Sequence, residues 1–281
     1  MQRAAIALAV LTVAGAAGCS SSKKTSASTT RASVATTTTT TAPPVATMTK
    51  RSAVSPIYGQ GVARVANGWV LSGTRWLAHT DESLHQTSIN EHAIPPAWMA
   101  RGYDHVGDID IVGNVLYAPY EEPDYSLGHQ ATAMYDATTL RFESAVVLPQ
   151  HQNSFVTVDP KTMIAYSMDG FGGAALLRYD VAQAWKRLPP LKLSQFVDRV
   201  QGGDIAQGAA WLSTDDARKE LYRVDLATGH VDALASQGFL DGEGEGIDAT
   251  PLPSGLLHAL VVPKGLVPIW FQAFRVGPGP A

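Results

Sequence analysis

The stretch Glu220–His230, ELYRVDLATGH, is an apolar strand that ends in an aspartate and runs into a turn. Two earlier stretches have the same form, ATAMYDATTL at Ala131–Leu140 and ALLRYDVAQAW at Ala175–Trp185. The aspartates that end the three strands are Asp136, Asp180 and Asp225, so the intervals are 44 (136 to 180) and 45 (180 to 225) residues. An aspartate carboxylate accepts hydrogen bonds from backbone N–H groups just ahead of it, which favours a turn. One strand-and-turn unit therefore repeats along the chain.

A second, polar motif repeats in phase with the first. Its five copies are YGQGVARV from Tyr58, HVGDIDIV from His105, HQNSFVTV from His151, QGGDIAQG from Gln201 and EGEGIDAT from Glu243. Five units of about 45 residues, each with several short strands, predict an all-β, five-bladed β-propeller of four-stranded antiparallel blades. The turn YRVDLATG resembles the third-strand turn of many bacterial propellers. A β-sandwich with periodic strands is the alternative, and a sixth blade would have to lie in His79–Gly102.

The last unit ends after IWFQAFRV and lacks a fourth strand. We therefore expect the segment around Arg51–Pro56, before the first unit, to complete that blade and close the ring.

Composition excludes several classes of protein. The 281 residues carry a net charge of −4, and only 16% are charged, below the quarter or so that is usual. Nucleic acid is not expected as a partner, because its binding calls for a basic face. The single cysteine, Cys19, excludes an intrachain disulfide.

The first residues are typical of an export signal. Arg3 precedes the apolar run Ala4–Ala17, which is too short to span a bilayer comfortably. AAGC at Ala16–Cys19 resembles the lipobox of bacterial lipoproteins, which implies a signal peptide over residues 1–18, a lipidated (palmitate-bearing) Cys19 and an anchor in the outer face of the cell membrane. An ordinary secretory peptide followed by a free thiol is the alternative.

Residues 19–52 are rich in Ser, Thr and Pro and have almost no bulky apolar side chain. Such a segment buries too little surface to offset its chain entropy, so we expect a disordered linker. Residues 53–281 then form the propeller domain, which we expect to be monomeric.

Strand order sorts the polar residues by face. The starts of the first strands and the ends of the second strands share one mouth of the central channel, whereas the turns near Asn114, Pro160 and Pro253 lie on the opposite face and carry little chemistry. A concave site with converging polar groups is the default binding site. The expected ligand-binding residues are Tyr58, Gln60, Gln152, Gln201, Glu121, Asp169 and Asp215.

The same mouth offers oxygen ligands for Ca²⁺ or another divalent cation. The candidates are Glu243, Glu245, Asp108, Asp204 and Asn153. Glu243, followed by glycine at the start of an inner strand, resembles the metal-binding glutamate of the regucalcin and gluconolactonase group and of esterase-like propellers. That resemblance implies an axial divalent ion held by Glu243.

His105 and His151 are candidate general bases, because histidine titrates near neutral pH; a structural role is the alternative for each. Two functions follow. The first is a surface-anchored lipoprotein that binds an unidentified small molecule or protein at an acidic channel mouth, with or without a divalent cation. The second is a divalent-metal-dependent hydrolase acting on a lactone, ester or phosphoester at the same place. The sequence does not decide whether the protein is an enzyme.

The glycines of DGEGEGIDAT, Asp241–Thr250, do not predict a phosphate loop, because no helix and no P-loop lysine follow them. We expect them instead to let strand backbones crowd together at a narrow channel.

Overall fold

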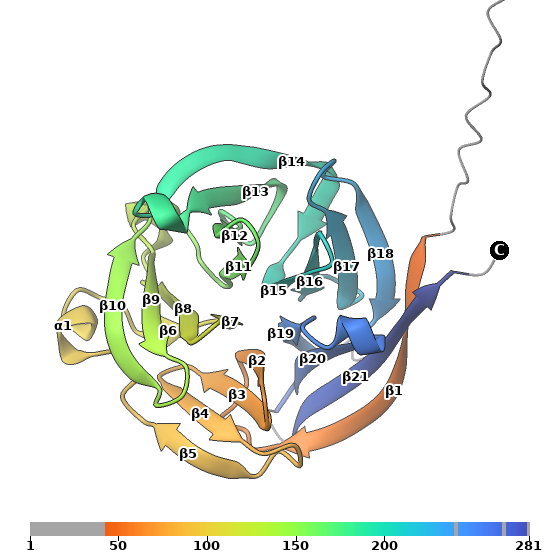
Figure 1. Cartoon of the computed structure of the whole chain (residues 1–281), viewed down its shortest axis with the longest axis horizontal. Helices are drawn as coiled ribbons and strands as arrows, with labels where there is room; N and C mark the ends of the chain where they lie inside the picture. Colours follow the sequence, from red (N-terminus) through yellow and green to blue (C-terminus); the bar gives the residue numbers. More distant parts are fainter. Residues whose placement is uncertain (1–42, 239–240, 266–267, 280–281) are drawn as a thin grey trace, which may run out of the picture. The chain divides into compact units, whose positions relative to one another are not determined.

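The structure is a computed structural model that describes residues 43–238, 241–265 and 268–279. Five antiparallel sheets surround a central channel as the blades of a β-propeller (Figure 1). The prediction of five blades is confirmed. Cys19, the signal peptide and most of the expected linker lie outside the described residues.

Each blade runs from an innermost strand at the channel to an outermost strand. Blade 1 is β2 (Gly61–Val65), β3 (Gly68–Gly73), β4 (Trp76–Thr80) and β5 (Gln86–Asn90). Blade 2 is β6 (His105–Val106) with β7 (Asp110–Val112), then β8 (Val115–Glu121), β9 (Ala131–Asp136) and β10 (Arg141–Val147). Blade 3 is β11 (Thr157–Asp159), β12 (Ile164–Ser167), β13 (Gly172–Asp180) and β14 (Lys186–Asp198).

Blade 4 is β15 (Val200–Ala206), β16 (Ala209–Thr214), β17 (Glu220–Asp225) and β18 (Val231–Ser236). Blade 5 is β19 (Gly242–Asp248), β20 (Leu256–Pro263), β21 (Ile269–Pro278) and, outermost, β1 (Pro44–Val54). The helices are short: α1 (Pro96–Met99), η1 (Tyr125–Leu127), η2 (Val181–Gln183) and η3 (Leu252–Ser254). No described helix is both long enough and apolar enough to cross a membrane.

The ring is closed by the amino-terminal strand, as expected. β1 pairs antiparallel with β21 over its whole length (Figure 1). The strand begins at Pro44, however, and not near Arg51, so residues 44–52 belong to the propeller and the predicted boundary at residue 53 is too late. The stretch His79–Gly102 holds β4, β5 and α1, and no sixth blade.

The turn aspartates behave as the repeat predicts. Asp225 Oδ1 accepts hydrogen bonds from the N–H groups of Ala227 (3.1 Å) and Thr228 (2.9 Å), and Asp136 and Asp180 cap the equivalent turns. Apolar side chains fill the space between neighbouring blades. Trp69 and Trp211 are both buried there.

Candidate functional site

A cavity of about 160 Å³ opens at the mouth of the channel where the inner strands of most blades begin. Its lining is almost entirely polar and comes from all five blades. The lining residues are Gln60, His105, Gly107, Glu121, Tyr125, Gln152, Ser154, Phe171, Gln201, Glu243 and Glu245. The structure therefore brings together Gln60, Gln152, Gln201, Glu121, His105, Glu243 and Glu245 of the residues predicted from sequence.

The copies of the polar motif do not all contribute the same motif position to this cavity. Blades 2 and 4 contribute the first residue of the motif, His105 and Gln201, whereas blade 1 contributes the third, Gln60. The inner strand of blade 1, β2, begins only at Gly61, after the motif starts at Tyr58, whereas β6 begins at His105 and β15 at Val200. Equal positions in the motif are consequently not at equal depth in the channel.

The floor of the cavity is built around Asp108, which is 1% exposed. Its carboxylate accepts backbone N–H bonds from Val62 (3.1 Å), Gly203 (2.9 Å) and Ile247 (3.1 Å), in blades 1, 4 and 5, and also one from Ile109 (3.0 Å). Burial raises the pKa of Asp108 well above its usual value, and these four donors oppose that shift because they stabilise the charged form. Asp108 was expected to bind a metal; the structure shows it holding blades together.

Glycines allow this close approach. A Cβ on Gly246 would lie 2.6 Å from the Cα of Gly61 and 2.5 Å from the Asp108 carboxylate, and one on Gly202 would lie 2.6 Å from the carbonyl oxygen of Glu245. The expectation that the glycines of Asp241–Thr250 let strand backbones approach closely is confirmed.

Two glutamates of β19 share one edge of the cavity. Glu245 is 6% exposed and Glu243 is exposed at the rim. Burial, followed by the charge of Glu243 and a side-chain hydrogen bond with it, raises the pKa of Glu245 well above its usual value. Glu245 therefore keeps its proton to a higher pH than an exposed glutamate does.

His105 and Glu121 face the cavity from blade 2. His105 Nε2 lies 2.6 Å from Gln60 Oε1, so the ring donates this hydrogen bond. Glu121 accepts bonds from the backbone N–H of Asn153 (3.0 Å) and the hydroxyl of Tyr125 (3.4 Å). Burial raises the pKa of Glu121, and the nearby charge of His105 opposes the rise.

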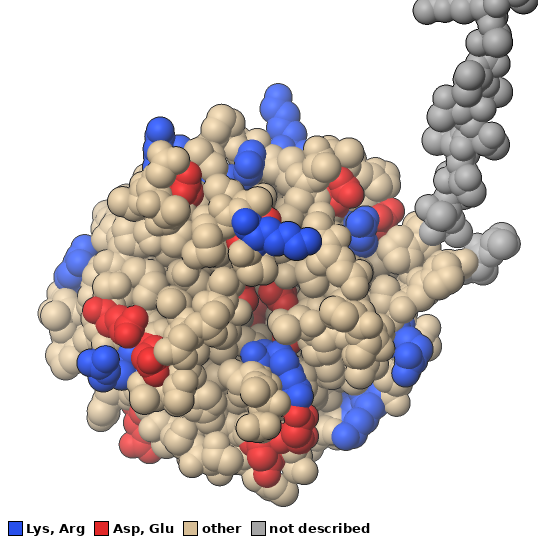
Figure 2. All heavy atoms as spheres, in the orientation of Figure 1, with Lys and Arg blue, Asp and Glu red and all other residues tan. Residues whose placement is uncertain are grey.

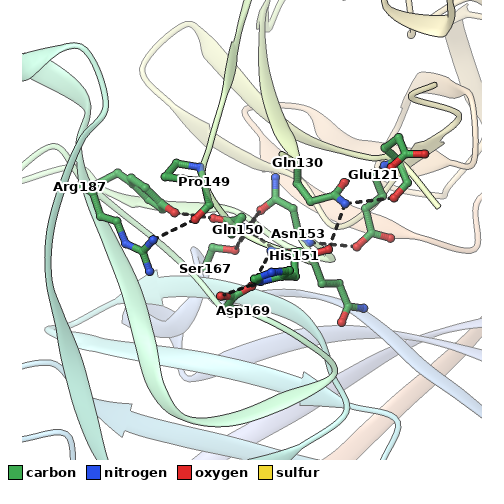
Figure 3. A network of polar contacts seen from close by, with 12 residues as sticks. Glu121, Gln130, Pro149, Gln150, His151, Asn153, Ser167, Asp169 and Arg187 are labelled. Carbon is green, nitrogen blue, oxygen red and sulfur yellow. Dashed lines mark hydrogen bonds and ion pairs between the residues drawn. The ribbon is translucent and has the colours of Figure 1, made fainter. Parts of the chain in front are cut away.

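His151 and Asp169 do not line the cavity. They contact each other, with 3.2 Å between His151 Nδ1 and Asp169 Oδ1, and the His151 side chain is 62% exposed (Figure 3). Asn153 is fully buried, and its side chain bonds Gln150 and Ser167. These three residues form a polar network within blade 3 and at its border with blade 2.

Two further candidates lie elsewhere. Tyr58 is buried among apolar side chains, and its hydroxyl bonds Gln86. Asp215 pairs with Arg199 and with Lys219, whose Nζ is 2.6 Å from Asp215 Oδ1. Tyr58 is the first residue of the motif in blade 1. Because β2 begins only at Gly61, Tyr58 does not lie at the channel mouth.

Asp204 lies deeper in the channel with Asp110 and Asp248. Asp204 accepts a bond from the N–H of Ala249 (2.6 Å) and Asp110 one from that of Val158 (2.7 Å), so each links its blade to the next. Burial, and then the charges of Asp110 and Asp248, raises the pKa of Asp204. Burial raises the pKa of Asp110 to about 6 and that of Asp248 to about 7. Acidic atoms are visible in the central depression of the face shown in Figure 2.

Metal ligation was also expected at the mouth. Among residues 43–238, 241–265 and 268–279, no three His, Cys, Asp or Glu side chains are grouped so that they could hold a metal ion. The carboxylates of Asp108 and Asp204 point into hydrogen bonds with backbone N–H groups of other blades instead.

The sequence did not single out Phe171 on the aromatic side of the mouth. Tyr125 and Phe171 meet edge to face, with 5.5 Å between ring centroids, and Phe171 is 47% exposed. The sequence assigned the ends of the second strands to the mouth. Phe171 follows the second strand of blade 3, just as Glu121 ends the second strand of blade 2, so its position indicated that it lies at the mouth. An exposed aromatic side chain in such a turn is worth singling out.

Comparisons with known proteins identify the fold alone. No family model and no curated protein sequence matches the chain. The crystal structure of a glutaminyl cyclase from Myxococcus xanthus is similar, with a TM-score of 0.64, 14% identity, and coverage of 84% of this chain and 99% of that one. A luciferin-regenerating enzyme is similar with a TM-score of 0.51 and 14% identity over 76% of each chain.

Proposed function

We propose that the channel mouth binds a small ligand that carries a positively charged group, such as an organic ammonium ion. The observation that supports this most is the charge of the lining: three glutamates and one histidine, with no lysine or arginine among the described lining residues. A concave, acidic cavity concentrates cations because its charges add at the centre.

The hydrogen-bonding groups support the same ligand. Gln60, Gln152 and Gln201 line the cavity, and their amide oxygens can accept bonds from an ammonium group. The faces of Phe171 and Tyr125 offer a further attraction for a cation. An ammonium ion beside Glu245 would also favour the charged form of that carboxyl group, whose pKa burial and the charge of Glu243 raise.

A divalent cation fits this geometry less well. Among the described residues, no three His, Cys, Asp or Glu side chains are grouped to hold one ion, so the metal-dependent hydrolase has less support than the binding function. We therefore propose a binding function for the mouth, with an organic cation as the ligand.

The test is a calorimetric titration with benzylamine. The Glu243→Gln variant removes one rim charge without disturbing the buried floor, so we expect it to bind benzylamine roughly fivefold more weakly. Glu143→Gln, on the exposed outer strand β10, removes the same charge elsewhere and should leave the affinity unchanged. Equal affinities of the two variants, or no binding to the wild type, would overturn the proposal.

We further propose that this mouth works outside the cell, with the domain tethered through a lipid on Cys19. The support comes from AAGC at Ala16–Cys19 and from the polar stretch after it. Labelling cells with an alkyne fatty acid should tag the wild type and not the Cys19→Ser variant. Equal labelling of both would show that Cys19 carries no lipid.

A further inference from the structure

A second cavity, of about 310 Å³, lies on the face opposite the mouth, between blade 5 and blade 1. β2 runs away from the mouth, and Arg64 near its end lines this cavity together with Trp69. β1 contributes Lys50 and Ser52 from the closing strand of the ring. The sequence assigned only ordinary turns to this face. The volume falls at the lower end of the range for small-ligand sites, about 300–1,000 Å³.

One wall of the cavity is aromatic. Trp69 contacts His258 and Phe271 edge to face, with 4.6 and 4.8 Å between ring centroids, and His258 stacks on Phe271 at 5.1 Å. His258 is only 7% exposed, and its Nδ1 has no hydrogen-bond partner among the described residues. A buried polar group without a partner costs free energy, so a ligand oxygen that reached this ring would be favoured.

The other side is charged. Arg64 stacks on Trp69, with 4.6 Å from its guanidinium carbon to the ring centroid, and forms two hydrogen bonds to the carboxylate of Glu82. Those two charges cancel. Lys50 forms no ion pair or hydrogen bond through its ammonium group with any residue that the structure describes.

The placement of Lys50 results from a distortion of β1. The ladder between β1 and β21 shifts register between Met48 and Lys50, and the extra residue, Thr49, bonds the carbonyl oxygen of Ala273 at 3.1 Å. A β-bulge of this kind re-aims the side chains beside it. Lys50 and His258 both pair with Ala273 of β21, one from each side, and both line the same cavity.

We propose that this cavity is a binding site for a small aromatic carboxylate, with the ring of the ligand against Trp69 and Phe271 and its carboxylate toward Lys50. The lining charges sum to one positive charge when His258 is neutral, which selects an anion. The ligand class is opposite in charge to that of the channel mouth, so the two sites take different molecules.

The protonation state of His258 is consistent with a net lining charge of one positive charge. Burial, followed by the positive charge of Arg64, lowers its pKa to about 4; Lys50 adds to the lowering and Glu82 opposes it. The ring is therefore neutral near pH 7 and adds no charge of its own. A bound carboxylate would counter the effect of Arg64 and Lys50.

The test compares benzoate, benzyl alcohol and benzylamine, which share one ring and differ in charge. Each is titrated into the intact protein by calorimetry and by tryptophan fluorescence, with Trp69→Phe identifying the signal from the cavity. We expect benzoate to bind, benzyl alcohol to bind more weakly, and benzylamine to leave the Trp69 signal unchanged. Lys50→Glu should weaken benzoate binding at least fivefold, because it reverses the unpaired charge.

Lys161→Glu is the matched control, since Lys161 lies exposed in the turn between β11 and β12 on the same face of blade 3. It should bind benzoate like the wild type. The proposal fails if benzoate does not bind at up to about 10 mM, if the two lysine variants lose affinity equally, or if benzylamine perturbs Trp69 as benzoate does. Glu243→Gln should affect benzylamine only, so each site can fail without the other.

Discussion

At the scale of single residues, Asp108 stabilises the fold by joining blades through backbone hydrogen bonds. It is a buried carboxylate that accepts four backbone N–H bonds, three of them from other blades. Hydrogen bonds to a charged acceptor are roughly twice as strong as neutral ones. One side chain therefore links the inner strands of blades 1, 2, 4 and 5.

Asp108→Asn tests that role. The amide oxygen can still accept from Val62 and Ile109, but the NH₂ group would face the N–H groups of Gly203 and Ile247. Two buried donors without acceptors cost about 2–6 kcal/mol of unfolding free energy. Urea unfolding measures the loss. Asp159→Asn, at the half-buried end of β11, keeps an acceptor for the N–H of Lys161 and should change stability by less than about 0.5 kcal/mol; equal effects would show that Asp108 does not link the blades as proposed.

The polar residues of the mouth could be predicted from sequence in part. Gln60, Gln201 and Glu245 were identified because the repeat places inner-strand starts around one channel. Tyr58 and His151 were placed there wrongly, because β2 begins only at Gly61 and β11 only at Thr157, several residues after each motif starts, and no local sequence pattern reveals this delay. The role of Asp108 was also missed, since its four donors come from parts of the chain that are close only after folding.

At the scale of elements, the closing strand β1 joins the two ends of the repeat. Its ladder with β21 extends from the pair Pro44 and Pro278 to the pair Val54 and Ile269. Closing the ring in this way covers the edge of β21, which would otherwise expose unpaired N–H and C=O groups. The existence of this strand was predictable from the missing fourth strand of the last unit. Its start at Pro44 was not, because these residues continue the Ser, Thr and Pro-rich stretch and pair only with residues far along the chain.

Two truncations test the contribution of β1. A chain that starts at Pro43 keeps the whole strand, and we expect it to unfold at the same temperature as the full-length protein. A chain that starts at Ser55 loses the ladder with β21, and its melting temperature should fall by about 10 °C or more. Calorimetry measures both. A longer truncation that melts like the shorter one would show that β1 adds nothing to the propeller.

At the scale of the whole molecule, three carboxyl groups are buried in the channel below the floor of the cavity. Asp110, Asp204 and Asp248 are buried together, and Asp248 Oδ2 has no hydrogen-bond partner among the described residues. The pKa of Asp248, at about 7, lies above its unfolded value of 3.8. Its contribution to stability is therefore fully present below about pH 4 and is lost as the pH rises through 7.

Asp248→Asn should make this loss visible. The variant keeps the bond from the N–H of Thr250 and carries no charge, so it should gain stability relative to the wild type as the pH rises from 4 to 8. A gain on the order of 2 kcal/mol at pH 8 is expected. Denaturant unfolding at several pH values measures the difference. A difference that stays constant with pH would mean that Asp248 is not held with a raised pKa.

The two faces of the ring differ in charge as well as in shape. The mouth gathers three glutamates from blades 2 and 5, whereas the cavity between blades 5 and 1 presents Lys50 beside an aromatic wall. The five-bladed fold was predictable because its repeats are local in sequence. The second cavity was not, because it forms only where the first and last blades meet.

The most direct test of the central claim, a cation site at the channel mouth, is a crystal structure of the protein grown with benzylamine. We expect the amine nitrogen within hydrogen-bond distance of Glu243 or Glu121, with the ring beside Phe171 and Tyr125. Benzylamine bound only outside this cavity, or an empty mouth at a concentration that saturates the calorimetric titration, would contradict the claim.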